Sequence, residues 1–337
     1  MKKFSFKKNI KKLFIFKLIE PFYWFFKYSY ESIKNKLIDF LYPRMFLEYI
    51  KIFFYPPIHI QWDLILSRKK NQKYLKNNFN KKIMFVPFYG FSDAVLLFES
   101  LVAKSLELRG HSIFSLSCDA SLPACQWNIH GNSDPLFINN KRNIFQINNL
   151  SRCNTCSLKI KKTYTSSKIK NISLNKVKKI NDVTQAEKFL KTQDLNYENN
   201  IIYKGINIAE HSRATALRHL LRGTLEDNSY TRSIYYRFLL SSIILTDLYE
   251  RILLTEKPDR IVASHGMYIE HGILCSLANK LNIPIIIWGV PYRKNCILAS
   301  HNDTYHREMI HEPVTIWQDI ELNSERNKRL DNYLFSK

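Results

Sequence analysis

The clearest hydrophobic pattern in the chain is a strand, a helix and a second strand in succession. Residues 82–87 (KIMFVP) form a short apolar run beside charged neighbours, the pattern of a buried parallel strand. Apolar residues then recur at helical spacing over residues 94–108. Gly110 follows where glycine commonly ends a helix, and residues 111–117 have the pattern of a second strand. The order predicts a βαβ unit.

The same pattern returns later in the chain. Residues 260–264 (RIVAS) predict a strand, residues 268–281 a helix, and residues 285–288 (IIIW) another strand. Residues 205–257 are typical of helices, and Asn228 or Ser229 can cap a long helix that runs to about residue 254. Such alternation of strands and helices predicts an α/β fold with a parallel sheet.

We therefore expect a Rossmann-like parallel sheet with helices on both faces, in which the strands at 83–87 and 261–264 lie side by side. The predicted domain covers residues 58–317 and contains a Cys-rich insertion at 118–160. The wider region 118–200 is rich in loop-forming residues, and the basic stretch 161–179 is expected to be an exposed excursion.

The two ends of the chain are different in character. Residues 1–57 predict a basic, aromatic helical extension, because residues 4–36 interleave Lys with aromatic side chains at near-helical spacing. Such a helix can lie in a membrane interface, and the alternative is that it packs on its own domain. Residues 318–337 predict a polar, helix-like tail.

The charge balance favours anionic partners. The chain has 51 Lys and Arg against 29 Asp and Glu, a formal net charge of +22, part of which follows from an AT-rich composition bias. Nucleic acid ranks low among the partners, because the lysines are scattered and no recognition motif is present. No uncharged apolar run reaches the roughly 18 residues that a membrane span needs, and no signal peptide is recognisable. We expect a cytoplasmic protein. The same features are compatible with peripheral binding to the anionic inner face of the plasma membrane.

Four of the six cysteines fall between residues 118 and 156. They are Cys118, Cys125, Cys153 and Cys156. Four thiolates at such spacing can hold a structural zinc ion, and an iron–sulfur cluster is the weaker metal alternative. The remaining alternative is a set of thiols without a metal. Cys275 and Cys296 lie in apolar runs and are expected in the core.

Two segments resemble a known family. Residues 83–117, with Arg-Gly-His before the second strand, resemble the opening of two-domain GT-B glycosyltransferases. Residues 257–265 (KPDRIVASH) and 283–288 (IPIIIW) resemble a later piece of the same N-terminal domain, and the whole resemblance spans about residues 81–317. The best match is the type that makes capsular or other surface polysaccharides. It implies transfer of a sugar from a nucleotide-sugar donor to a glycan or lipid-linked acceptor.

The resemblance also implies a second, donor-binding Rossmann domain, for which this chain has no counterpart after residue 317. Three interpretations follow: a separate polypeptide supplies that domain, the gene product is truncated, or the domain has taken a binding role. The alternative is a non-catalytic, metal-stabilised module that binds acidic glycan or a membrane surface.

Candidate catalytic and binding residues follow the predicted strands. His265 comes directly after a strand, where ligands gather in open α/β sheets, and His265 or Asp303 would suit as the base that takes the acceptor proton. Tyr268, His301 and His306 can bind sugar hydroxyls or a pyrophosphate. For any one of these histidines the alternative is a hydrogen-bonded structural role.

The loop after the first strand and a basic helix add further candidates. By resemblance, this loop approaches the acceptor, so Tyr89 and Gly90 are expected to contact substrate. Asp93 could accept a proton or simply cap the helix. Arg213, with Arg218 and Arg222, forms a basic face that can bind phosphate or an anionic sugar, and the alternative is a solvated face.

Overall fold

The computed structural model describes residues 80–88, 90, 92–129, 150–291, 296–318 and 320–335. The predicted N-terminal extension and Tyr89 lie outside the described residues, so the predictions made for them stay predictions. Within the described ranges, no helix combines the length and apolar character that crossing a membrane requires.

A six-stranded sheet forms the centre of the molecule, in the order β10-β9-β8-β1-β2-β5. The strands are β1 Lys82–Phe85, β2 Ser112–Ser117, β5 Lys170–Ser173, β8 Arg260–Ser264, β9 Ile285–Gly289 and β10 Leu298–His301. Met84 is in register with Ile261 of β8 on one side and Phe114 of β2 on the other. The prediction that the two distant strands lie side by side in one parallel layer is thus confirmed. Only β10 runs antiparallel in this sheet.

The sheet has the topology of a doubly wound fold. In chain order its strands lie as 3-2-1-4-5-6, with β1 and β8 at the centre. From β1 the chain winds outward through β2 to β5, then returns to β8 and winds the other way through β9. The carboxyl ends of β1 and β8 therefore flank the point where the winding reverses, and this is where open α/β sheets bind ligands.

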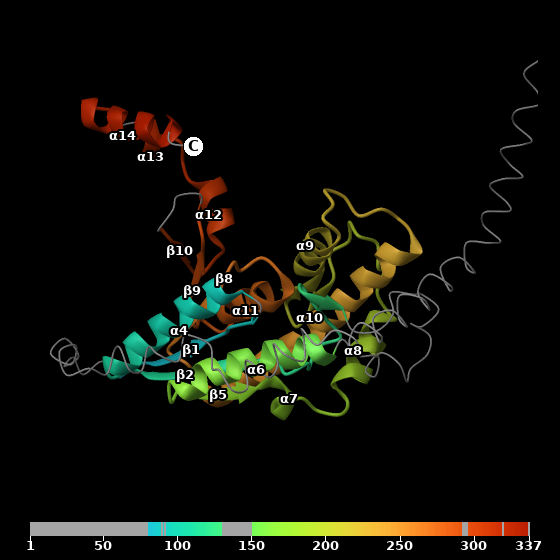
Figure 1. Cartoon of the computed structure of the whole chain (residues 1–337). Coiled ribbons are helices and arrows are strands. Elements are labelled where there is room, and N and C mark those ends of the chain that lie inside the picture. The colour runs from blue at the N-terminus through green and yellow to red at the C-terminus, as the bar shows by residue number, and fades with distance from the viewer. Residues whose placement is uncertain are drawn as a thin grey trace, which may run out of the picture.

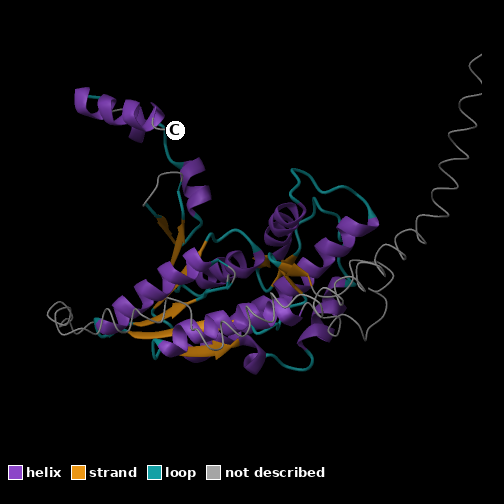
Figure 2. Ribbon diagram, viewed as in Figure 1, coloured by secondary structure: helices purple, strands orange, loops and turns teal. Residues whose placement is uncertain are grey.

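Helices cover both faces. The helices among the described residues are α4 Asp93–Leu108, α6 Leu150–Ser166, α7 Leu174–Val177, α8 Asp182–Leu190, α9 Ile208–Leu220, α10 Ser229–Glu256, α11 Ile269–Lys280, α12 Tyr305–His311, α13 Thr315–Gln318 and α14 Ser324–Phe335. In Figures 1 and 2, α4 and α6 cross one face of the sheet, and α10 and α11 lie on the other. This division follows from right-handed crossovers that proceed in opposite directions from the centre.

The long helix α10 is the main apolar support of its face. No Gly or Pro interrupts it, and the side chain of Asn228 accepts a 2.9 Å hydrogen bond from the backbone N–H of Thr231, as predicted for the cap. Its side chains from Ile234 to Tyr249 are almost all buried, because α10 packs against α8, α9 and α11 at once. A helix enclosed on all sides in this way can be apolar around its whole circumference.

Two small hairpins complete the described strands. They are β3 Ala124–Cys125 with β4 Asn128–Ile129, and β6 Ile202–Tyr203 with β7 Ile206–Asn207. The first packs on α10, where the hydroxyl of Ser241 accepts a 2.9 Å hydrogen bond from the backbone N–H of Ala124.

The region predicted to be loop-rich is more regular than expected. Helix α6 spans residues 150–166, and β5 adds an edge strand inside the stretch that was predicted to be an exposed excursion. That prediction was wrong because β5 (KNIS) is too polar to stand out, and only pairing with β2 reveals it. Cys275 is buried as predicted, whereas Cys296 is exposed and not part of the core.

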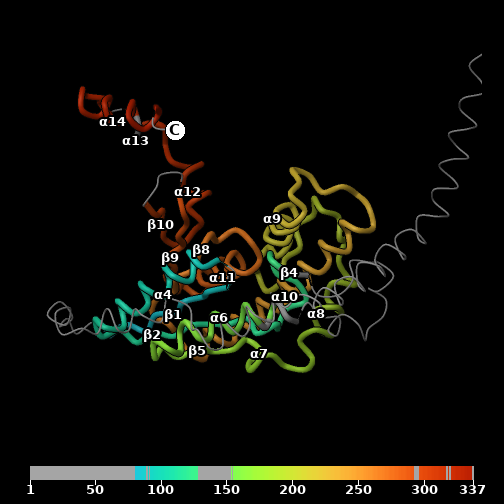
Figure 3. The backbone as a smooth tube through the Cα atoms, viewed as in Figure 1, coloured from blue at the N-terminus to red at the C-terminus, as the bar shows by residue number. Residues whose placement is uncertain are grey.

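The C-terminal segment leaves the sheet. Figures 1 and 3 show α13 and α14 set apart from the layered body. Every residue that the structure describes in α14 is exposed, including Tyr333, Leu334 and Phe335.

Candidate functional site

The carboxyl end of β8 carries a residue in an unusual conformation. His265 has φ of +60°, in the left-handed region that β8 itself does not use, and its N–H donates a 2.9 Å hydrogen bond to the carbonyl of Trp288. Gly266 follows at φ of +68°, and a Cβ there would lie 3.0 Å from the side chain of Ile287. The surrounding structure must hold this turn in place, which is a common property of functional sites.

The side chain of His265 is held by the segment that follows β10. Nδ1 of its imidazole lies 3.0 Å from the hydroxyl of Tyr305, and the hydroxyl of Thr304 donates a 2.7 Å bond to its backbone carbonyl. The ring of Tyr268 approaches edge-on at 6.5 Å, and the ring of His306 stacks at 4.2 Å on that of Tyr305. His265 after β8, Tyr268 before α11, and Tyr305 and His306 in α12 therefore meet at one end of the sheet.

The electrostatic surroundings favour a neutral His265. Burial lowers the pKa of this imidazole, and the positive charges of His306 and Arg218 lower it further. Burial also lowers the pKa of His306. A neutral imidazole can accept a proton near neutral pH, and the same basic neighbours would attract an anionic substrate.

A second histidine fastens the site to the centre of the sheet. Nε2 of His271 lies 2.8 Å from the carbonyl of Val86, and Nδ1 lies 3.4 Å from the hydroxyl of Ser264. The ring meets that of Phe88 edge-on at 6.0 Å. Burial lowers the pKa of His271 to about 4, so this side chain is a neutral structural link between β1, β8 and α11.

Two further predicted residues lie elsewhere in this region. His301 is exposed and pairs with Ile286, at the end of β10 nearest the amino ends of the parallel strands, whereas His265 is at their carboxyl ends. The carboxylate of Asp303 accepts a 2.6 Å bond from the N–H of Thr304 and pairs with Arg307 at 3.3 Å. Asp303 thus stabilises the turn that delivers Tyr305, and its catalytic role stays a prediction.

The other predicted side chains have structural partners of their own. Asp93, the first residue of α4, pairs with Lys159 of α6 at 3.2 Å. The guanidinium of Arg213 donates a 2.9 Å bond to the carbonyl of Tyr197. Its neighbour Arg218 is the arginine whose charge reaches His265.

Thr304 and Tyr305 are the two members of the site that sequence reasoning did not name individually, although both lie in the recognised polar segment. Arg218 was named as part of the basic helix, but not as a group whose charge acts on His265. Their proximity to His265 depends on how α9 and the chain after β10 fold back.

The four clustered cysteines also lie near the carboxyl ends of the strands. Cys118 follows β2, Cys125 is in β3, and Cys153 and Cys156 are in the first two turns of α6. Burial raises the pKa of Cys118 to about 12, with Cys153 adding to the rise, and raises that of Cys156 to about 11. As oriented, no three His, Cys, Asp or Glu side chains in the described ranges form a metal-holding group, so the zinc prediction stays a prediction.

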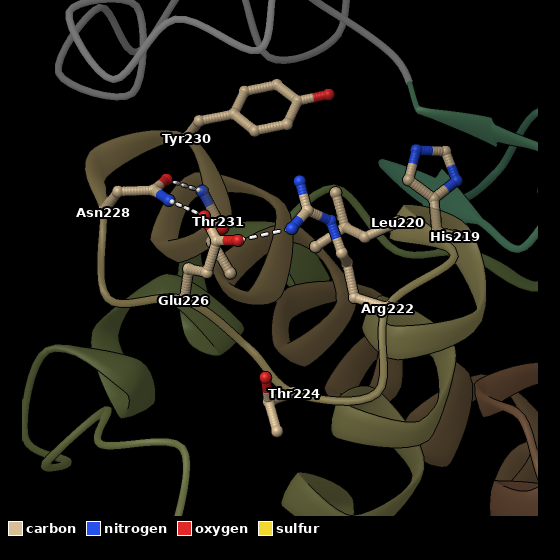
Figure 4. Close-up of a pocket in the computed structure, with 8 residues that line it drawn as sticks. All are labelled: His219, Leu220, Arg222, Thr224, Glu226, Asn228, Tyr230 and Thr231. Carbon is tan, nitrogen blue, oxygen red and sulfur yellow. Dashed lines mark hydrogen bonds and ion pairs between the residues drawn. The ribbon is translucent and has the colours of Figure 1, made fainter.

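A pocket of about 290 Å³ opens where α9 meets α10. Figure 4 shows Arg222 ion-paired with Glu226, with the rings of His219 and Tyr230 on either side in this view. Nδ1 of His219 lies 3.5 Å from the carbonyl of Gln126, so the pocket borders the segment between β3 and β4. Its lining residue His219 follows Arg218 in α9.

Comparison with known proteins gives no match to the chain, whether the chain is compared with family models, with curated proteins or with solved structures.

Proposed function

We propose that this chain provides the acceptor-side half of a glycosyltransferase of surface polysaccharide synthesis. A sugar would pass from a nucleotide-sugar donor to a glycan or lipid-linked acceptor bound at the carboxyl ends of β1 and β8. The donor would lie in a second Rossmann domain of the kind that the GT-B resemblance implies. The observation that carries the proposal is the position and conformation of His265 beside the point where the winding of the sheet reverses.

In this proposal His265 is the general base. When its Nδ1–H donates to the hydroxyl of Tyr305, Nε2 is the basic nitrogen, and it can take the proton of an acceptor hydroxyl as that oxygen attacks the sugar. The lowered pKa keeps the imidazole neutral at pH 7 and ready for this step. Tyr305 then acts as a positioning residue that fixes the tautomer and the ring.

Basic groups around His265 favour the binding of an anionic substrate. Arg218 at the end of α9 and His306 at the start of α12 lie within electrostatic reach of the imidazole. The pyrophosphate of a sugar nucleotide or of a lipid-linked acceptor fits such a positive region. Tyr268 adds an aromatic face of the kind that packs on sugar rings.

The test measures nucleotide release from UDP-, GDP- and CMP-sugars, with polysaccharide or lipid-linked acceptors and with candidate partner chains added. We expect His265→Gln to lower kcat by about 10²- to 10⁴-fold, the usual contribution of a general base. His311→Gln is the matched control, because His311 is exposed at the other end of α12. Turnover that is unchanged in His265→Gln, or absent in the folded native chain under every condition, would refute the proposal.

A second candidate function is a non-catalytic, metal-stabilised module that binds acidic glycan or a membrane surface. The gathering of four thiols near one edge of the sheet favours it. Flotation with vesicles containing anionic lipid distinguishes the two, if the full chain is compared with a chain lacking residues 1–57. Under this alternative the full chain floats, the shortened chain floats less, and neither releases nucleotide.

A further inference from the structure

A cavity of about 520 Å³ opens beside the start of α10. Its other wall is the segment that follows α8, and the lining residues are Asp194, Leu195, Asn196, Tyr197, Asp227, Arg232, Tyr235 and Tyr236. None of them lines the pocket of Figure 4, and none belongs to the group around His265. Pockets that bind small molecules commonly measure roughly 300–1,000 Å³, so this cavity has room for a ligand.

Tyrosine side chains supply the aromatic part of the lining. The rings of Tyr197 and Tyr235 meet almost at right angles, with 78° between their planes and 5.2 Å between their centroids. Tyr235 is 1% exposed, so its neighbours hold it in place, and Tyr236 adds a further ring. Burial raises the pKa of Tyr235 and of Tyr236 to about 12, so both phenols are uncharged at neutral pH. Such rings pack on the apolar C–H surface of a ligand.

The polar groups of the lining are already oriented by one another. Nε and one Nη of Arg232 donate to the two carboxylate oxygens of Asp227, at 2.5 and 2.7 Å. The carboxylate of Asp194 accepts a 3.2 Å bond from the N–H of Asn196 and a 2.8 Å bond from the amide of Asn199. A guanidinium has more N–H donors, and a carboxylate more acceptor positions, than these bonds use. The cavity therefore offers both donors and acceptors to a ligand, and the charges of Asp227 and Arg232 compensate each other.

The hydroxyl of Tyr235 is buried and has no hydrogen-bond partner among the described residues. A buried hydroxyl without a partner costs about 1–3 kcal/mol, and a phenylalanine would avoid this cost with the same ring. A hydroxyl kept in the wall of a cavity therefore points to a bound polar molecule that supplies the partner.

A neutral sugar unit fits this lining better than an ion does. The ring of a sugar has C–H faces that pack on aromatic rings, and each of its hydroxyls can both donate and accept a hydrogen bond. A phosphate would face the carboxylates of Asp194 and Asp227, whereas an ammonium ion would face the guanidinium of Arg232. A ligand without net charge avoids both repulsions.

We propose that this cavity binds a neutral sugar unit of a glycan, with the tyrosine rings against the sugar ring and with Asp227 and Arg232 hydrogen-bonded to its hydroxyls. The site holds the sugar without reacting with it, so it is distinct from the transfer proposed at His265. The proposal goes beyond that function and does not depend on it, because no residue of the cavity takes part in the proposed transfer.

The experiment measures sugar binding to the folded full-length chain by saturation-transfer NMR and calorimetry. The neutral probes are the methyl glycosides of glucose, galactose, mannose and N-acetylglucosamine, together with lactose and cellobiose. Choline and inorganic phosphate are the charged probes. We expect at least one neutral sugar to bind and the charged probes to leave the cavity empty. Absence of binding by every neutral probe, or binding of a charged probe in this cavity instead, would overturn the proposal.

Variants of the lining test where the sugar binds. Tyr236→Ala and Arg232→Gln should each weaken binding at least about tenfold. Tyr230→Ala is the matched control on α10, because Tyr230 does not line this cavity, and Arg329→Gln is the control for an exposed, ion-paired arginine. The side chain of Arg232 is 66% exposed, so Arg232→Gln should fold and keep the Tm of the native chain. Equal weakening in the control variants would contradict the assignment.

His265→Gln separates this site from the proposed transfer. The variant should bind the sugar as tightly as the native chain does, whatever its effect on nucleotide release. Weaker binding in His265→Gln, together with unchanged binding in Tyr236→Ala, would place the sugar at His265 and overturn the proposal.

Discussion

The indole of Trp288 on β9 donates a 3.0 Å hydrogen bond from Nε1 to Oε1 of Glu99 on α4. Glu99 is fully buried, and its other carboxyl oxygen has no hydrogen-bond partner among the described residues. Burial raises the pKa of Glu99 to about 8, although the bond from Trp288 lowers it. The carboxyl that joins the helix layer to the sheet is therefore protonated at neutral pH.

This carboxyl predicts a loss of stability at alkaline pH. The folded chain keeps the proton of Glu99 up to about pH 8, whereas the unfolded chain releases it near pH 4.5. The free energy of unfolding should therefore fall as pH rises through this interval, by a few kcal/mol as an order of magnitude. Glu99→Gln keeps the acceptor for Trp288 and should remove this dependence.

Urea unfolding at pH 5 and pH 8.5 measures the effect. Glu198→Gln is the control, because the side chain of Glu198 is 86% exposed. Equal pH dependence in the native chain and in Glu99→Gln would contradict the assignment.

His271 predicts sensitivity to acid. Its folded pKa of about 4 lies below the ordinary value of 6.5, so the folded chain binds fewer protons than the unfolded chain between these values. The contribution of neutral His271 to the free energy of unfolding should be fully present above about pH 6.5. The free energy of unfolding should then fall by roughly 3 kcal/mol as the pH drops to 4. His271→Gln should flatten this part of the curve while lowering stability at pH 7, because bonds to Val86 and Ser264 are altered. Chemical unfolding between pH 4 and 7 measures both effects, with His311→Gln as control.

The candidate site requires a residue without a side chain at position 289, beside the ring of Tyr305. A Cβ at this position would overlap the phenol ring of Tyr305, the partner of His265. Gly289→Ala should cost about 1–3 kcal/mol through overpacking and should move the ring away from the imidazole. Gly223→Ala is the matched control, because a Cβ there meets no atom within 4 Å. Thermal unfolding and the histidine NMR signals of both variants test this. Equal Tm values and equal histidine signals in the two variants would contradict the steric requirement at Gly289.

His265 predicts the pH dependence of the proposed transfer. A general base must be deprotonated, so kcat/KM should fall as pH drops through the lowered pKa of His265, below 6.5, and should be level near neutrality. Tyr305→Phe removes the hydroxyl that positions the ring and should lower kcat more than it changes KM. The measurement is kcat/KM from pH 5 to 9 for the native chain and this variant. An acidic limb that persists unchanged in His265→Gln would assign the base to another group.

Much of the fold could be predicted from the sequence because its central strands are unusually apolar. The runs at Ile83–Phe85 and Ile261–Ala263 can be stable only when buried on both faces, and a parallel sheet provides that environment. The cap at Asn228 and the helix end at Gly110 (φ +94°) are local features that near neighbours determine. His265 could be placed at a strand end for the same reason.

Which polar side chains meet depends on tertiary packing, and the local sequence does not predict it. Polar strand β5 has no strong hydrophobic signal of its own and is held by its pairing with β2, while α6 packs on β2 and β5. Tyr305 reaches His265 because the chain reverses after the antiparallel β10, and the charge of Arg218 acts on His265 because α9 packs on α11. Local hydrophobic patterns in the sequence specify the central strands and the helices beside them, because those residues must be buried, whereas contacts between residues distant along the chain depend on how these elements pack together.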